Sequence, residues 1–141
     1  MFRIIWISTL FSVLACSDKS ATDGTDPFAC DGATCACTDA GCACADDASG
    51  CSLDCSQASN CAADCGSNSE CEVACSGAEN CAVDCSASST CAVDCTGTST
   101  CAVKCPASGC TVTNCDPLSS CAVQCSDGSA ATYASGTATC P

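Results

Sequence analysis

The sequence predicts a small, disulfide-rich and mainly β protein, built as a short-coil β-solenoid-like stack of ten-residue repeats. Three observations point to this fold class. Cysteine recurs with a period of ten between Cys51 and Cys125, side-chain polarity alternates with a period of two inside each repeat, and the cysteine register is restored after one irregular stretch. Self-similarity at a fixed period is the sequence signature of stacked repeat structures.

Each repeat reads Cys-x3-Cys-x5, and its clearest copies are Cys-Ala-Val-Asp-Cys at Cys81–Cys85 and Cys91–Cys95. Alternation over five positions is typical of a strand, and the Ser/Gly/Asn/Thr runs between cysteine pairs are turn formers. We therefore expect each ten-residue unit to supply one strand and one turn, and to form one coil that covers its neighbour. The paired cysteines stand at 51/55, 61/65, 71/75, 81/85, 91/95 and 101/105.

The irregular stretch from Cys101 to Cys121 also favours a stack. Its cysteine spacings are 4, 5, 5 and 6 residues, because the segment 111–114 gains one residue and the preceding loop 106–109 loses one. The total is still 20 residues, which is two full periods. Stacked coils need their register to be restored, whereas a disordered linker does not.

Strand geometry restricts the disulfide pairing. Cysteines four residues apart in a strand are separated by about 13 Å at about 3.3 Å per residue, whereas a disulfide requires Cα atoms about 4.4–6.8 Å apart. Two pairings remain: a Cys-x5-Cys bridge across a turn, as between Cys85 and Cys91, or a bridge between equivalent cysteines of adjacent coils. A third interpretation makes Cys-x3-Cys one helical turn, but the alternating pattern favours strands.

Residues 1–15 are expected to be a signal peptide, because the apolar run from Ile4 to Leu14 is too short to span a bilayer. The run ends in Val13-Leu14-Ala15-Cys16, which resembles the lipobox of bacterial lipoproteins. The resemblance implies cleavage before Cys16, attachment of lipid (palmitate among the acyl chains) to this cysteine and, with Ser17 following, anchoring in the bacterial outer membrane. An ordinary signal peptide with an incidental cysteine is the alternative.

The cysteine count agrees with export. The chain has 23 cysteines, so lipidation of Cys16 leaves 22, an even number that can form eleven bridges. Disulfides persist in oxidising compartments outside the cytosol. We therefore expect the other cysteines to be oxidised in pairs.

Three further segments flank the repeats of residues 51–125. Residues 16–29 comprise the lipidated cysteine and a flexible polar tether, residues 30–50 form a Cys-x-Cys cap region, and residues 126–141 form a C-terminal tail. A bridge from Cys140 back into the stack would act as a C-terminal staple. The Cys-x-Cys pairs resemble those of metallothioneins, in which thiolates hold soft metals, and this resemblance implies a rival metal site at Cys35, Cys37, Cys42 and Cys44.

Large apolar side chains are too few for a conventional core. The repeats offer about one each, so disulfides must offset much of the entropy lost on folding. Cysteine sulfur also fills buried apolar space. The apolar residues are Leu53, Val73, Val83, Val93, Val103, Val112, Leu118 and Val123.

The charge excludes several functions. Sixteen acidic residues against three basic ones give a net charge of −13, so we expect no nucleic-acid partner and no electrostatic attraction to an anionic membrane. If each repeat is one coil, aspartates fall at the same outward position of successive coils and offer oxygen ligands to a divalent cation. An acidic face that keeps the protein soluble is the simpler interpretation. The aspartates are Asp54, Asp64, Asp84 and Asp94, in a row interrupted by Ala74 and ended by Lys104.

The chain has no histidine, no glycine-rich phosphate loop and no Cys-x2-Cys redox motif, so we expect neither an enzyme nor a cofactor. We expect a non-catalytic cell-envelope lipoprotein with a structural, adhesive or protective role, and the repeats loosely resemble cysteine-rich repeat lipoproteins of bacterial genomes. A thiol-based metal-binding protein is the alternative. The stack also resembles the disulfide-braced β-helices of insect antifreeze proteins, which makes ice binding a remote option. A peptide-interaction module is another, through the loop residues Gln57, Asn68, Glu70, Glu72 and Glu79.

Overall fold

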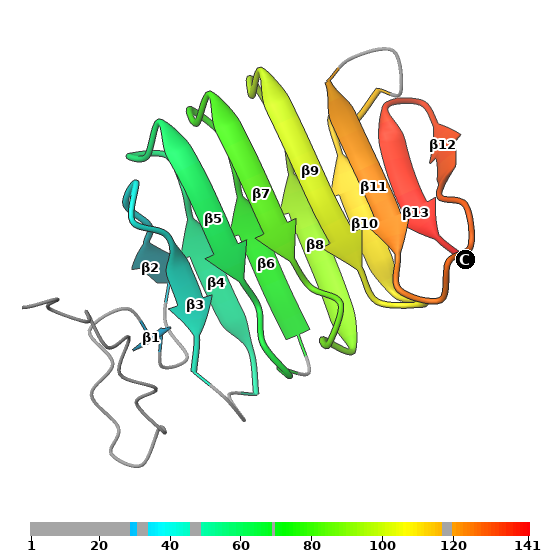
Figure 1. Cartoon of the computed structure of the whole chain (residues 1–141), viewed down its shortest axis with the longest axis horizontal. Coiled ribbons are helices and arrows are strands. Elements are labelled where there is room, and N and C mark those ends of the chain that lie inside the picture. The colour runs from blue at the N-terminus through cyan, green and yellow to red at the C-terminus, as the bar shows by residue number, and fades with distance from the viewer. Residues whose placement is uncertain (1–28, 31–33, 46–48, 69, 117–119) are drawn as a thin grey trace, which may run out of the picture.

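The computed structural model describes residues 29–30, 34–45, 49–68, 70–116 and 120–141. Within these ranges the chain forms a β-solenoid of about four turns, which confirms the predicted fold class (Figure 1). Two sheets face each other across a thin core. No helix that is long and apolar enough to cross a membrane occurs in these ranges.

The strands of the two sheets alternate along the chain. Sheet A contains, in spatial order, β1 (Ala29–Cys30), β3 (Cys42–Cys44), β5 (Asn60–Asp64), β7 (Asn80–Asp84), β9 (Thr100–Cys105) and β11 (Cys121–Cys125). Sheet B contains, in spatial order, β12 (Thr132–Ala134), β13 (Thr137–Cys140), β10 (Cys110–Thr113), β8 (Thr90–Asp94), β6 (Glu70–Ala74), β4 (Cys51–Asp54) and β2 (Thr34–Ala36). All neighbouring strands are parallel except β13, which is antiparallel to both β10 and β12.

One coil uses two repeats, so the expectation that each ten-residue unit forms its own coil was wrong. Cys61 in β5 is in register with Cys81 in β7, twenty residues later, while the intervening strand β6 lies in the opposite sheet. The disulfide across each turn explains this arrangement. It holds the Cα atoms of Cys85 and Cys91 6.2 Å apart, so the chain crosses the core at every turn and regains its own sheet only at the second turn.

Within the repeat strands β4 to β11 the inward positions are cysteine, one aliphatic residue and, where the chain enters the turn, cysteine again. In β8, Cys91 and Val93 are buried whereas Thr90 and Ala92 are exposed. The core is therefore a single layer, with an aliphatic row along its middle and sulfur on both sides. The aliphatic side chains that are at most 3% exposed are Leu53, Val73, Val83, Val93, Val103 and Val112.

Eleven disulfides pair all 22 cysteines of the described residues. Of the two pairings that the sequence left open, the structure has the Cys-x5-Cys bridges across turns and not the bridges between coils. The x5 bridges are Cys55–Cys61, Cys65–Cys71, Cys75–Cys81, Cys85–Cys91, Cys95–Cys101 and Cys115–Cys121. Shorter or longer turns give Cys30–Cys35, Cys37–Cys42, Cys44–Cys51 and Cys105–Cys110. The C-terminal staple is Cys125–Cys140.

The compensated spacing between Cys101 and Cys121 keeps the stack in register. Cys121 lies opposite Cys101, as the restored period predicted. The additional residue is accommodated at Asn114, whose φ of 55° places it in the left-handed region that asparagine tolerates better than most residues. Its side-chain amide donates hydrogen bonds to Asp94 Oδ1 and Thr96 Oγ1 of the previous coil in the same sheet.

Candidate functional site

The residue predicted to carry lipid, Cys16, lies outside the described residues. The predicted signal peptide and all of the tether as far as Phe28 also lie outside them.

The four cysteines of the rival metal site are all in disulfides. Cys37 is bonded to Cys42, whereas Cys35 is bonded to Cys30 and Cys44 to Cys51. A sulfur atom in a disulfide has no thiolate charge to offer a metal ion. In this oxidised form the Cys-x-Cys segment therefore acts as a covalent brace, and its strands β2 and β3 extend the two sheets toward the N-terminal end.

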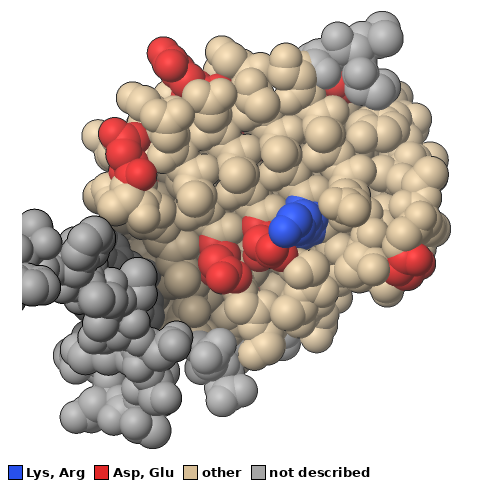
Figure 2. All heavy atoms as spheres, viewed as in Figure 1, with Lys and Arg blue, Asp and Glu red and all other residues tan. Residues whose placement is uncertain are grey.

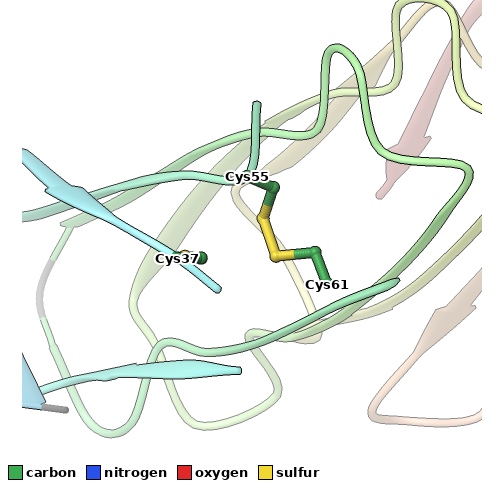
Figure 3. Close-up of side chains that lie close together, drawn as sticks. All are labelled: Cys37, Cys55 and Cys61. Atoms are coloured by element: carbon green, nitrogen blue, oxygen red, sulfur yellow. A yellow bond between two sulfur atoms is a disulfide. The ribbon is translucent and has the colours of Figure 1, made fainter. Parts of the chain in front are cut away.

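Sulfur atoms of neighbouring coils nevertheless lie close together. Cys37 lies beside the Cys55–Cys61 bridge, with the three sulfur atoms all within 4.8 Å of one another (Figure 3). Cys65, Cys85 and Cys91 form a similar group, and the non-bonded contact between Cys65 Sγ and Cys85 Sγ is 3.2 Å. Stacked coils thus place each bridge against the bridge of the next coil.

The outward face of sheet A carries the most distinct surface feature. A row of exposed alanines, one from each of four neighbouring strands, forms the floor of an open groove of about 460 Å³. The polar side chains Asp64, Asp84, Lys104 and Gln124 line the groove along one side. The alanines are Ala62, Ala82, Ala102 and Ala122. Figure 2 shows this face, with two acidic side chains and one basic side chain in a row near its middle and further acidic side chains toward its edges.

The charged row is built by register. Asp64, Asp84 and Lys104 occupy equivalent positions of β5, β7 and β9, and Lys104 Nζ lies 3.3 Å from Asp84 Oδ2. The pKa of Asp84 is lowered chiefly because the Ser86 hydroxyl donates to its carboxylate, with Lys104 adding to the effect. Lys104 is the only Lys or Arg within the ranges that the structure describes.

The outward face of sheet B is different in charge. Its outward acidic residues are Asp54, Glu70, Glu72 and Asp94, with no basic residue among the described part of this sheet. Its groove is smaller, about 240 Å³, and is lined by Glu72, Asp94 and two threonines among others. The two broad faces therefore differ: sheet A is nearly neutral and apolar along its middle, and sheet B is acidic.

The expected single row of four aspartates is not formed. Because a coil contains two repeats, Asp64 and Asp84 are neighbours in sheet A, whereas Asp54 and Asp94 lie in sheet B on either side of Ala74. Each of the four instead accepts a hydrogen bond from the backbone N–H two residues later, at 2.9–3.1 Å. This Asx-turn contact starts the reversal after each strand, which gives these aspartates a structural role.

The five residues considered for peptide binding do not form one site. Asn68 is fully buried, and its side chain donates to the Cys65 carbonyl. Glu70 and Glu72 lie on β6 in sheet B, while Gln57 and Glu79 are exposed in turns.

Comparison with protein-family models, with curated proteins and with solved structures found no match.

The sheet A groove was not predicted from the sequence, although a signal for it exists. The residue after the first cysteine is alanine in every second repeat, at positions 62, 82, 102 and 122, but varies in the alternate ones, which carry serine at 52, glutamate at 72, alanine at 92 and threonine at 111. That twenty-residue period marks one face of the coil.

Proposed function

We propose that this chain is a non-catalytic lipoprotein of the bacterial cell envelope, in which lipid on Cys16 anchors a rigid solenoid at the outer membrane in a structural, adhesive or protective role. The observation that carries the proposal is the complete pairing of the 22 cysteines within the described residues. Such pairing suits an oxidising compartment outside the cytosol, and it leaves Cys16 as the one cysteine available for lipid.

The cross-linked geometry suits a non-catalytic module that must resist unfolding and proteolysis. Nearly every turn is closed by its own bridge, and the strands are joined by turns of a few residues. Proteases attack segments that open locally, and short cross-linked turns have little freedom to open. Two broad faces remain available for contacts at the cell surface, at a distance from the membrane set by the tether.

Expression of the full chain in a Gram-negative bacterium tests the anchor. We expect a metabolically incorporated palmitate analogue to label the wild-type chain, which then fractionates with the outer membrane. Cys16→Ser should abolish the label and remove the protein from the outer-membrane fraction, while Ser17→Ala, the matched neighbour, should retain both the label and the outer-membrane location. Label persisting on Cys16→Ser, or absent from the wild type, would refute the anchor.

A thiol-based metal-binding function is the second candidate, favoured by the sulfur groups that stacking creates. Reduction of the bridges Cys65–Cys71 and Cys85–Cys91, with two electrons each, would leave four thiols, three of which lie within 4.8 Å of one another in the oxidised form. Counting free thiols in the denatured, exported protein separates the candidates. Nearly none before reductant supports the braced envelope module, whereas many thiols with bound zinc or copper support metal binding.

A further inference from the structure

We propose that the outward face of sheet A binds a second copy of this chain, with the two alanine grooves face to face and the charged rows pairing across the interface. This inference goes beyond the proposed anchoring and does not depend on it. It rests on the order of the side chains along the groove.

The order of charges in the row is self-complementary. Along the solenoid the row reads Asp64, Asp84, Lys104, Gln124. A two-fold axis lying in the interface, parallel to the strands and midway between β7 and β9, reverses the order in the second copy. Asp84 then faces Lys104 of the other copy and Lys104 faces its Asp84, while Asp64 faces the neutral Gln124. An isologous contact of this kind closes on itself as a dimer.

The same operation pairs the rest of the face. Ala82 of β7 comes opposite Ala102 of β9 in the second copy, and Asn80 comes opposite Thr100. Sheets that present small side chains pack closely, and aligned packing keeps the strands of the two sheets nearly parallel. Dimerisation would thereby remove the alanine rows from water. Burial of such an exposed apolar strip contributes favourable free energy to association.

The other broad face cannot pair with itself in this way. Sheet B presents four outward acidic residues and, within its described strands, no cation to oppose them. With a net charge of −13 on the chain, two copies are expected to repel each other except where a cation is placed to meet an acid. Lys104 supplies that cation on sheet A.

The contact area indicates a weak dimer. Four strands spaced about 4.8 Å apart, with five residues of about 3.3 Å each, give a footprint of about 300 Å² per copy. Stable interfaces bury about 800 Å² per partner. Association is therefore expected at high concentration, such as that of molecules crowded on one membrane surface, and should weaken with added salt.

Charge exchange gives a direct test by sedimentation of the full chain carrying Cys16→Ser, so that lipid cannot drive association. The Cys16→Ser chain with an otherwise unchanged sheet A face should dimerise as its concentration rises. Asp84→Lys and Lys104→Asp should each weaken dimerisation by roughly tenfold or more, because like charges then face each other. The double exchange should restore it, and an equimolar mixture of the two single variants should form heterodimers.

Matched alanine variants locate the contact. Ala82→Lys on β7 should abolish dimerisation, whereas Ala92→Lys, the same position of the repeat on sheet B, should leave it unchanged. Circular dichroism and thiol counts establish that each variant is folded and oxidised. A wild type that stays monomeric up to its solubility limit, a double exchange that fails to restore association, or greater sensitivity to Ala92→Lys would each overturn the proposal. Failure of the wild-type chain to take up the palmitate label would count against the membrane anchor but not against this dimer.

Discussion

Cys65 Sγ lies 3.2 Å from Cys85 Sγ in the next coil, although Cys65 is bonded to Cys71 and Cys85 to Cys91. The two sulfur atoms are neighbours without a bond, because stacking brings equivalent cysteines together while the bridges run across the turns. Proximity between coils therefore does not determine connectivity. The distinction matters because bridges between coils and bridges across turns would cross-link the solenoid in different ways.

The turn-by-turn connectivity predicts the result of cleavage before aspartate in the unreduced, denatured protein. Cleavage at Asp54, Asp64, Asp84 and Asp94 should release residues 54–63, 64–83 and 84–93 as separate peptides, because each contains both partners of its bridges. Residues from 94 onward should stay linked after cleavage at Asp116 and Asp127, because Cys115–Cys121 spans the first site and Cys125–Cys140 spans the second. Mass spectrometry measures both outcomes. Peptide 64–83 still joined to 84–93 would indicate bridges between coils.

A second prediction concerns complete reduction. The aliphatic row supplies about one large side chain per repeat, and each short bridge contributes roughly 2 kcal/mol. Eleven such contributions together exceed the roughly 5–15 kcal/mol by which ordinary domains are stable. Reduction with blocked thiols should therefore remove the strand signal in far-ultraviolet circular dichroism. Retention of that signal would mean that the core holds without sulfur.

Much of the fold follows from the sequence because the repeat is strict. Alternation in Cys-Ala-Val-Asp-Cys determines which side chains enter the core, and the restored spacing at Cys121 requires a stack. The coil length does not follow, because a ten-residue period fits one repeat per coil as well as two. Two repeats per coil are required only because the chain crosses the core at each bridged turn. The sheet A groove depended on that choice, since Asp84 and Lys104 are neighbours only when the coil is twenty residues long.

Gly109 and Gly97 offer a matched pair of substitutions. Both have positive φ, 76° and 73°, which costs an alanine about 1 kcal/mol. At Gly109 the new Cβ would also lie 2.9 Å from the Ser89 carbonyl oxygen of the neighbouring coil, whereas at Gly97 it would meet open space. Gly109→Ala should therefore lower the free energy of unfolding clearly more than Gly97→Ala in denaturant titration. Equal losses would show that the coils are not packed this closely.

Asp94 should make stability depend on pH. The Thr96 hydroxyl and the Asn114 amide donate to its carboxylate and lower its pKa. The lowered folded-state value means that the stabilisation is fully present above the unfolded pKa of about 3.9 and is lost as pH falls through the folded pKa. Asp94→Asn should reduce the dependence of melting temperature on pH in the acidic range.

A variant of the donor provides the control for Asp94. Asn114→Ala removes the hydrogen bonds from this amide to Asp94 and Thr96 but keeps the carboxylate, so the pKa of Asp94 should rise toward its ordinary value in a carbon-detected NMR titration. An unchanged titration would contradict the contact between the two coils.

The C-terminal tail should protect the end of the solenoid from pairing with other chains. β11 is the last strand of sheet A. The Tyr133 hydroxyl accepts a hydrogen bond at 3.3 Å from the Val123 N–H, and Gln124 and Ala130 pair through their backbones as an isolated antiparallel β-bridge. In sheet B, β13 pairs with β10. Unpaired strand edges recruit further strands, and covering them is a recognised protection against aggregation.

Removal of the staple tests this role. Cys125→Ala with Cys140→Ala should free the tail, uncover β10 and β11, and produce end-to-end oligomers in light scattering. Tyr133→Phe removes only one hydrogen bond, so it should cost about 1 kcal/mol and leave the protein unaggregated. Because these oligomers would form through strand edges, Ala82→Lys on the sheet A face should not prevent them. A stapleless variant that stays as dispersed as the wild type would show that the edges are protected by some other feature of the fold.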